Sequence, residues 1–88
     1  MVEATYVEGA REKRAPYREE HLSRIAKLYE EGVVVVAGAL ADMSASIFVL
    51  DLEREDSARA IVETDVYWRN GIWTDFSIRK LNRVVFAE

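Results

Sequence analysis

Two β-strands and the turn between them are predicted for residues 33–52, VVVVAGALADMSASIFVLDL. The strands cover residues 33–41 and 46–52, and both are rich in the β-branched residues that favour strands. Neither apolar run alternates with polar residues, so both faces of each strand are expected to be covered. Because the link over residues 42–45 is short, the two strands are expected to pair as an antiparallel hairpin.

A strand and a helix precede this hairpin, and a helix and a strand follow it. In the helical segments apolar residues recur every three or four positions, which is typical of one buried helix face. The expected elements are a strand at 2–7, a charged loop at 8–16, helices at 17–31 and 54–64, an aromatic turn of helix at 65–70 and a strand at 72–81. This order is that of the ferredoxin-like α+β fold, βαββαβ. We therefore predict one domain over residues 1–88, with a four-stranded antiparallel sheet and two helices on one face.

The second face of the predicted sheet has no helix to cover it. In the last strand, alternation places Trp73 and Leu81 on that face and Ile72, Phe76 and Ile78 on the other. A monomer rarely leaves a large apolar patch exposed to water. We therefore expect a homodimer in which two copies pack sheet against sheet about a two-fold axis.

The composition argues against several classes of protein. Acidic residues outnumber basic residues by 16 to 12, and a net charge of −4 argues against nucleic acid as a partner, because phosphate binding needs clustered Lys and Arg. The chain has no cysteine, so it offers no thiol nucleophile and no disulfide. Residues 1–5 show no basic segment leading into an apolar run, and no apolar stretch approaches the roughly 20 residues needed to cross a bilayer. A cytoplasmic location without a membrane partner is therefore expected.

His21 and Asp65 carry the functional hypothesis. His21 is the single histidine, and at about 100° per residue it lies just off the centre of the apolar face of its helix, with Arg18 one turn earlier in the same stripe. Asp65 continues the apolar line of the second predicted helix after Val62. There it would stand at the C-terminal end of the helix, where the dipole disfavours a carboxylate, so a histidinium or an arginine is expected to compensate it.

Together these two side chains suit acid–base chemistry. A carboxylate that bonds one imidazole nitrogen fixes the tautomer and leaves the other nitrogen as a base. Arg14 and Arg18 suit the binding of an anionic oxygen, because guanidinium pairs well with oxyanions. With a single histidine and no cysteine, the chain has no recognisable set of metal ligands. It also lacks a glycine-rich loop that would bind a phosphate group. Neither a metal nor a cofactor is therefore predicted.

The residues alone leave three interpretations of the pair. In the first it catalyses a reaction; in the second it helps to bind a small acid or aromatic molecule without converting it. In the third it only stabilises an oligomeric domain. Tyr67, Trp68 and Trp73 likewise either line a pocket for an aromatic substrate or pack in the core or at a dimer contact.

Seven short segments, in order along nearly the whole chain, resemble motifs of the YCII-related protein family. They are Lys13-Arg14, Arg18 to Leu22, Glu31-Gly32, Ala37-Gly38, Asp65 to Tyr67, Gly71 to Trp73 and Ser77 to Arg79. The second is similar to the family's R-x-x-H-L run and the fifth to its D-P-Y segment. Val66 stands where the family usually has proline, and residues 42–45 are shorter than the glycine-rich loop of many members.

The resemblance implies a ferredoxin-like fold that dimerises into an α/β barrel. It also implies an active site built on a His–Asp pair, which maps here to His21 and Asp65, with the family's arginine at Arg18 and, second to it, Arg14. The family includes a dehydrochlorinase that acts on chlorinated hydroquinones. For this chain the resemblance therefore implies a cofactor-free elimination or isomerisation of a small anionic or aromatic molecule.

Overall fold

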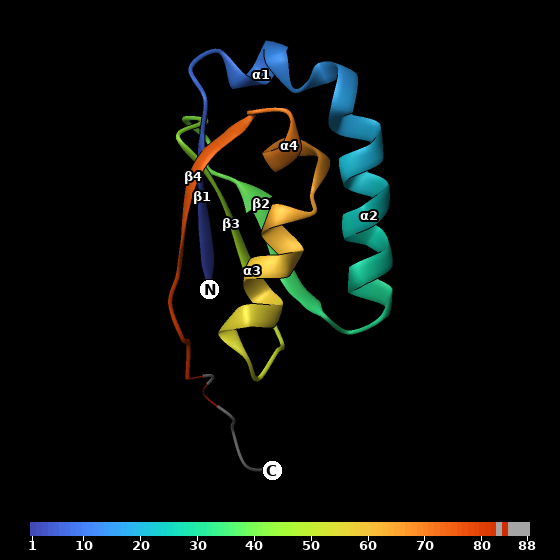
Figure 1. The fold of residues 1–88 in the computed structure, drawn as a ribbon, viewed down its shortest axis with the longest axis vertical. Helices are drawn as coiled ribbons and strands as arrows, with labels where there is room; N and C mark the ends of the chain where they lie inside the picture. The colour runs from blue at the N-terminus through green and yellow to red at the C-terminus, as the bar shows by residue number, and fades with distance from the viewer. Residues whose placement is uncertain (83, 85–88) are drawn as a thin grey trace.

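Strands and helices follow one another in the order predicted from the sequence (Figure 1). The structure, a computed structural model, describes residues 1–82 and residue 84. The strands are β1 (Val2–Tyr6), β2 (Val34–Ala39), β3 (Ala45–Leu50) and β4 (Trp73–Ile78). The helices are α1 (Ala10–Lys13), α2 (Arg18–Glu30), α3 (Glu55–Glu63) and α4 (Val66–Arg69), with a 3₁₀ turn at Ala15–Tyr17.

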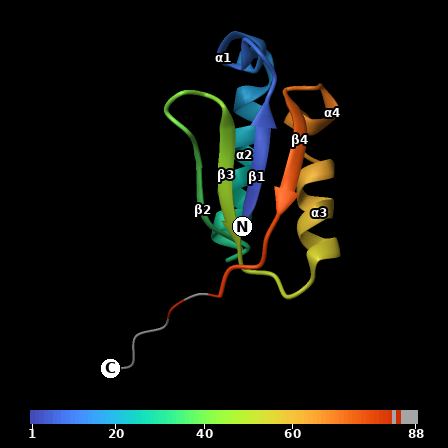
Figure 2. The same cartoon turned by 90° about the vertical axis from the view of Figure 1, so that its left-hand side faces the viewer.

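The four strands form one sheet in the order β2-β3-β1-β4, and every neighbouring pair is antiparallel. Figure 2 shows the sheet from its open face, with α2 and α3 both behind it. The predicted α+β class, the hairpin of β2 and β3 and the ferredoxin-like order are therefore confirmed. In the described part of the chain, no helix has both the length and the apolar character needed to cross a membrane.

Local sequence explains where the helices begin and end. Glu19 and Glu20 lie in the first turn of α2, where the helix dipole favours acids. Gly32, at a φ of 79°, reverses the chain after the helix, because glycine adopts this left-handed conformation without a steric penalty. The predicted loop at 8–16 instead contains α1 and most of the 3₁₀ turn, with Pro16 near the start of that turn.

The prediction that Trp73 lies on the open face was wrong, and an irregularity in β4 explains why. Tyr6 pairs with Trp73, whereas the neighbouring Thr5 pairs with Asp75, so Thr74 is an extra residue. Such a bulge reverses the alternation of side chains. Trp73 is therefore only 2% exposed and shares the helix-covered face with Phe76.

The stripe predicted for α2 also differs from the buried one. Leu22 and Tyr29 belong to the apolar residues that recur every three or four positions, yet Leu22 is exposed and Tyr29 is 64% exposed. The residues of α2 that turn inward are His21, Ile25 and Leu28, with spacings of four and three. The helix is thus rotated so that His21 lies fully within the buried line.

The open face of the sheet is apolar over one half and polar over the other. Residues that pair across antiparallel strands share a face, and the pairing places Val36, Ile47 and Val49 on the open face of β2 and β3. Over β1 and β4 the same face carries polar residues, namely Glu3, Thr5, Asp75 and Ser77. The buried core lies on the other face and includes Val2, Ala4, Tyr6, Phe48, Val62, Tyr67 and Trp73.

Candidate functional site

The imidazole of His21 and the carboxylate of Asp65 are in direct contact. His21 Nδ1 lies 2.9 Å from Asp65 Oδ1 and 3.0 Å from Oδ2. The two side chains are 10% and 1% exposed, respectively. The first turn of α2 and the segment between α3 and α4, 44 residues apart in the chain, thus bring the two groups together.

Asp65 occupies the start of α4, not the end of α3. Helix α3 ends at Glu63, and Asp65 is extended, with φ and ψ of −71° and 144°. Its Oδ1 accepts a hydrogen bond of 2.9 Å from the backbone N–H of Tyr67, which makes it the N-cap of α4. The expectation that the carboxylate faces the negative end of a helix dipole was therefore wrong, since the N-terminal end stabilises negative charge.

Arg24 is a third partner of the carboxylate and was not predicted. Its Nη1 donates to Asp65 Oδ2 over 3.2 Å and to the carbonyl oxygen of Ile61 over 3.0 Å, while Nη2 donates to Thr64 Oγ1 over 2.6 Å. Arg24 lies three residues after His21, on the same side of α2, and that spacing was the available signal. An arginine was expected to compensate Asp65, and Arg24 does so.

These contacts define the hydrogen positions on His21. Asp65 receives hydrogen bonds from His21, Arg24 and the Tyr67 backbone, and an ionised carboxylate only accepts. In the neutral imidazole these contacts favour the tautomer with its hydrogen on Nδ1, in which Nε2 presents a lone pair. Among the described residues, none forms a hydrogen bond with Nε2.

Two aromatic rings contact the imidazole and a third adjoins one of them, and we call these three residues together with His21 the His21 cluster. The Tyr67 ring stacks on the imidazole at 3.9 Å with an interplanar angle of 11°, and the Trp73 ring meets it edge-on at 5.4 Å. Tyr6 completes the set, with its ring 6.4 Å from that of Tyr67. The cluster holds the imidazole plane in one orientation, which suits directed proton transfer.

Of the two arginines predicted to bind substrate, Arg14 lies against the cluster. Its Nη1 donates to Tyr6 Oη over 3.3 Å. Arg18, the first residue of α2, is exposed and forms no hydrogen bond or ion pair with any described residue. Burial raises the pKa of the Tyr67 hydroxyl, and Tyr6 adds to this, whereas Arg14 and Arg18 oppose it.

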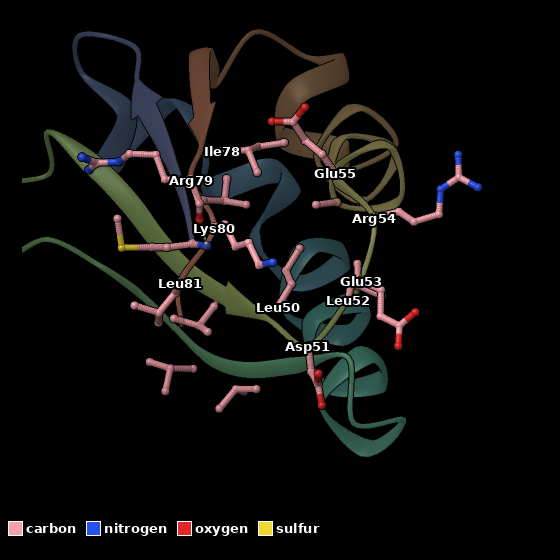
Figure 3. A pocket seen from close by; sticks show the side chains of 16 residues that line it. Leu50, Asp51, Leu52, Glu53, Arg54, Glu55, Ile78, Arg79, Lys80 and Leu81 are labelled. Atoms are coloured by element: carbon pink, nitrogen blue, oxygen red, sulfur yellow. Dashed lines mark hydrogen bonds between the residues drawn. The ribbon is translucent and has the colours of Figure 1, made fainter. Parts of the chain in front are cut away.

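A hollow in the described structure lies away from His21 and Asp65. It has a volume of about 740 Å³ and is lined by residues around the ends of β3 and β4 and the start of α3, including Leu50, Leu52, Glu55 and Ile78 (Figure 3). A second hollow of about 580 Å³ is lined by residues 6–11 and 42–44, so it reaches the cluster only through Tyr6. Neither is lined by His21 or Asp65.

We nevertheless place the candidate site at His21 and Asp65. Hollow size reports available space, whereas a buried imidazole held by a carboxylate with one free nitrogen is an arrangement with a defined chemistry. The large hollow contains carboxylates and basic side chains at its rim but no histidine. In the described residues, no group of three or more His, Asp or Glu side chains is placed to hold a metal ion.

The fold and the site define a class of protein: a ferredoxin-like domain with a buried His–Asp pair beside its helices. The chain belongs to the YCII-related domain family, whose model matches residues 1–82. It is 26% identical over 83 residues to "Protein YciI" of Escherichia coli O6:H1 (strain CFT073), and the aligned region covers 83% of this chain and 85% of the relative. The same values apply to "Protein YciI" of Shigella flexneri. The resemblance inferred from the sequence motifs is thereby confirmed.

Proposed function

We propose that this protein is a cofactor-free enzyme, a lyase or an isomerase, that moves a proton on a small organic molecule. His21 acts as the general base and then as the acid, and Asp65 orients it. The observation that carries the proposal is the bond of His21 Nδ1 to both oxygens of Asp65, which leaves Nε2 as a base.

In this proposal Nε2 of His21 removes a proton from the substrate. The imidazolium that forms is stabilised by the Asp65 carboxylate, to which it is already bonded. Arg14 and Arg18 provide positive charge for an anionic oxygen of the substrate. An imidazolium that returns its proton to another atom completes an isomerisation; loss of a leaving group from the deprotonated substrate completes an elimination.

The experiment measures exchange of carbon-bound hydrogen for deuterium in heavy water. A panel of small ketones, keto acids and chlorinated hydroquinones is incubated with the protein, and mass spectrometry detects exchange or loss of chloride. We expect turnover with the unmodified protein and a loss of at least 100-fold in His21→Gln, because positioned general bases contribute about 10²–10⁴-fold. Asp65→Asn is measured in the same assay. Its matched control is Asp51→Asn, which changes an exposed carboxylate outside the His21–Asp65 pair. Equal rates in His21→Gln and the unmodified protein contradict the catalytic role.

A second candidate function is binding without conversion. The observation that favours it is that the hollow lined by residues 6–11 and 42–44 adjoins the His21 cluster through Tyr6, although His21 and Asp65 do not line it. In that case a panel member binds, His21→Gln weakens its affinity, and no exchange appears in any compound.

We also propose that two copies associate through the open face of the sheet. The support is the apolar half of that face, formed by Val36, Ile47 and Val49, with Val36 59% exposed.

A further inference from the structure

Three polar side-chain atoms are enclosed by protein and have no hydrogen-bond partner among the described residues. They are Arg14 Nε, Tyr67 Oη and Trp73 Nε1. Tyr67 and Trp73 belong to the His21 cluster, and Arg14 bonds to its member Tyr6. Buried polar groups in folded proteins nearly always have a partner, so three such atoms on residues of the His21 cluster and on the adjoining Arg14 require an explanation.

All three atoms offer hydrogens. An arginine Nε and an indole Nε1 are donors only. The Tyr67 hydroxyl keeps its proton at neutral pH, because burial raises its pKa further above its ordinary alkaline value. The missing partner is therefore an acceptor. A water molecule would bring two hydrogens of its own, whereas an anionic oxygen brings acceptor positions alone and is also attracted by the nearby guanidinium groups.

We propose that the Tyr67 hydroxyl and the Arg14 guanidinium form an oxyanion subsite beside His21, which takes the oxygen of a small enolate or phenolate. Tyr67 thereby acts as a substrate-binding residue, and the Trp73 N–H is a further donor in the same cluster. This inference rests on the proposed function of His21 for its catalytic meaning, but the binding of an oxyanion stands apart from it.

The proposal defines the substrate class as carbonyl compounds with an acidic hydrogen on the adjacent carbon. His21 Nε2 takes that hydrogen as a proton, and the electron pair of the C–H bond forms the new C=C bond. The π pair of the C=O bond moves onto oxygen, where the Tyr67 O–H and Arg14 stabilise the negative charge. When that pair returns from oxygen and re-forms the C=O bond, the C=C pair expels a leaving group from the next carbon. Where a further C=C bond is conjugated to the enolate, the C=C pair shifts along the chain instead, and the far carbon takes the proton from the imidazolium.

The test measures binding of 4-nitrophenolate, a stable phenolate whose absorbance changes on binding. Its contact with the cluster is followed by the NMR signal of the Trp73 indole N–H, assigned with the help of Trp68→Phe. We expect the phenolate to bind at least tenfold more tightly than neutral 4-nitrophenol. Tyr67→Phe should lower phenolate affinity about tenfold or more, which is the cost of one lost bond to a charged group. Arg14→Met should lower it to a similar extent.

The control variant is Tyr29→Phe, which removes a hydroxyl from an exposed tyrosine of α2 and should leave affinity unchanged. An unchanged dispersion of the Trp73 signal shows that Tyr67→Phe is folded. The inference is overturned if the unmodified protein does not bind the phenolate, if it binds the neutral phenol equally well, or if Tyr67→Phe binds the phenolate with unmodified affinity.

His21→Gln separates this inference from the proposed function. It should keep the phenolate affinity within about threefold while losing deuterium exchange. Tyr67-dependent binding without exchange in any protein would overturn the catalytic proposal and support the subsite. Loss of phenolate binding in His21→Gln, as large as that in Tyr67→Phe, would place the oxygen on the imidazole and overturn the subsite.

Discussion

At the scale of single residues, Asp65 connects helices α2 and α4 at the candidate site. Its carboxylate is 1% exposed and receives hydrogen bonds from α2 through His21 and Arg24, and from α4 through the Tyr67 backbone. A buried carboxylate is stable only when such donors replace its hydration. The same contacts that orient the imidazole therefore also hold the helices against one another.

Replacement of Asp65 by asparagine should destabilise the fold. The amide carries no charge, and it leaves the partly buried Arg24 without its ionic partner. Loss of one member of a buried ion pair costs about 3–5 kcal/mol, and because Arg24 keeps some access to water we expect a loss of about 3 kcal/mol in urea denaturation. The control, Asp51→Asn, changes an exposed carboxylate and should shift stability by less than about 0.5 kcal/mol. Equal stability of the two variants would contradict the role given to Asp65.

The burial of the Tyr67 hydroxyl predicts how the stability of the folded chain changes at alkaline pH. Burial raises the pKa of its hydroxyl in the folded state above the unfolded value of about 10. Between these two values the folded chain holds a proton that the unfolded chain has lost, so stability falls as pH rises through this range. Tyr67→Phe removes this proton, and its stability should fall less steeply above about pH 10. Denaturation curves at neutral and alkaline pH measure the two slopes, and parallel slopes would count against a buried hydroxyl.

His21 and Asp65 were predictable as a pair because each lies in register with an apolar helix line, where a polar side chain needs a partner. Arg24 was not predicted, since one arginine in a chain with 12 basic residues is ordinarily a solvated surface group. The enclosed donors of Tyr67 and Trp73 were also beyond the sequence. An aromatic side chain lacks a hydrogen-bond partner only because of how the segments around it pack. The pattern of residues along the sequence does not show that packing.

At the scale of elements, the boundary between α3 and α4 sets the position of Asp65. The chain leaves α3 after Glu63 and starts α4 at Val66, with Asp65 extended between them. The residue before a proline prefers an extended conformation, which Asp65 has. The first position of a helix, which Val66 occupies, tolerates proline well. The family's proline after the aspartate is thus compatible with this backbone, and the N-cap bond to Tyr67 fixes Asp65 here without it.

Val66→Pro therefore tests this boundary. If Val66 is the first residue of a new helix, proline should change stability by less than about 1 kcal/mol, because the gain in chain stiffness offsets the lost packing of valine. Ala60→Pro is the control, since Ala60 is exposed and lies inside α3, where proline costs about 3 kcal/mol. Thermal unfolding of both variants measures the difference. A loss near 3 kcal/mol in Val66→Pro would show that α3 continues through Asp65.

The strand β4 shows where pattern reading fails at this scale. Strict alternation placed Trp73 opposite Phe76, but the extra residue Thr74 brings both onto the helix-covered face. A bulge depends on how two strands pair. Glycine often indicates a bulge in a sequence, but neither Thr74 nor either of its neighbours is a glycine. The consequence reaches the candidate site, since only the inward orientation allows Trp73 to meet the imidazole of His21.

At the scale of the whole molecule, the order of elements was enough to predict the topology. Short antiparallel connections and the pairing of β2 with β3 leave few ways to arrange four strands and two helices. The pattern therefore gave the sheet and the covered face correctly. It overestimated the apolar character of the open face, because the β1 and β4 half carries Glu3, Asp75 and other polar residues. Any partner must thus cover mainly the half formed by β2 and β3.

That half makes the proposed dimer testable. Ile47 lies on the open face between Glu3 and Gly38, and its side chain is only partly covered in the single chain. We expect sedimentation equilibrium to give a dimer for the unmodified protein and a monomer for Ile47→Lys, because a charge buried in an apolar interface costs several kcal/mol. Leu22→Lys, on the exposed side of α2, is the matched control and should remain dimeric. A monomeric unmodified protein, or a dimer that persists in Ile47→Lys, would remove the open face as the interface. Such a result would leave the phenolate site intact. His21 lies on the helix-covered side of the sheet, so a monomer could still bind the phenolate.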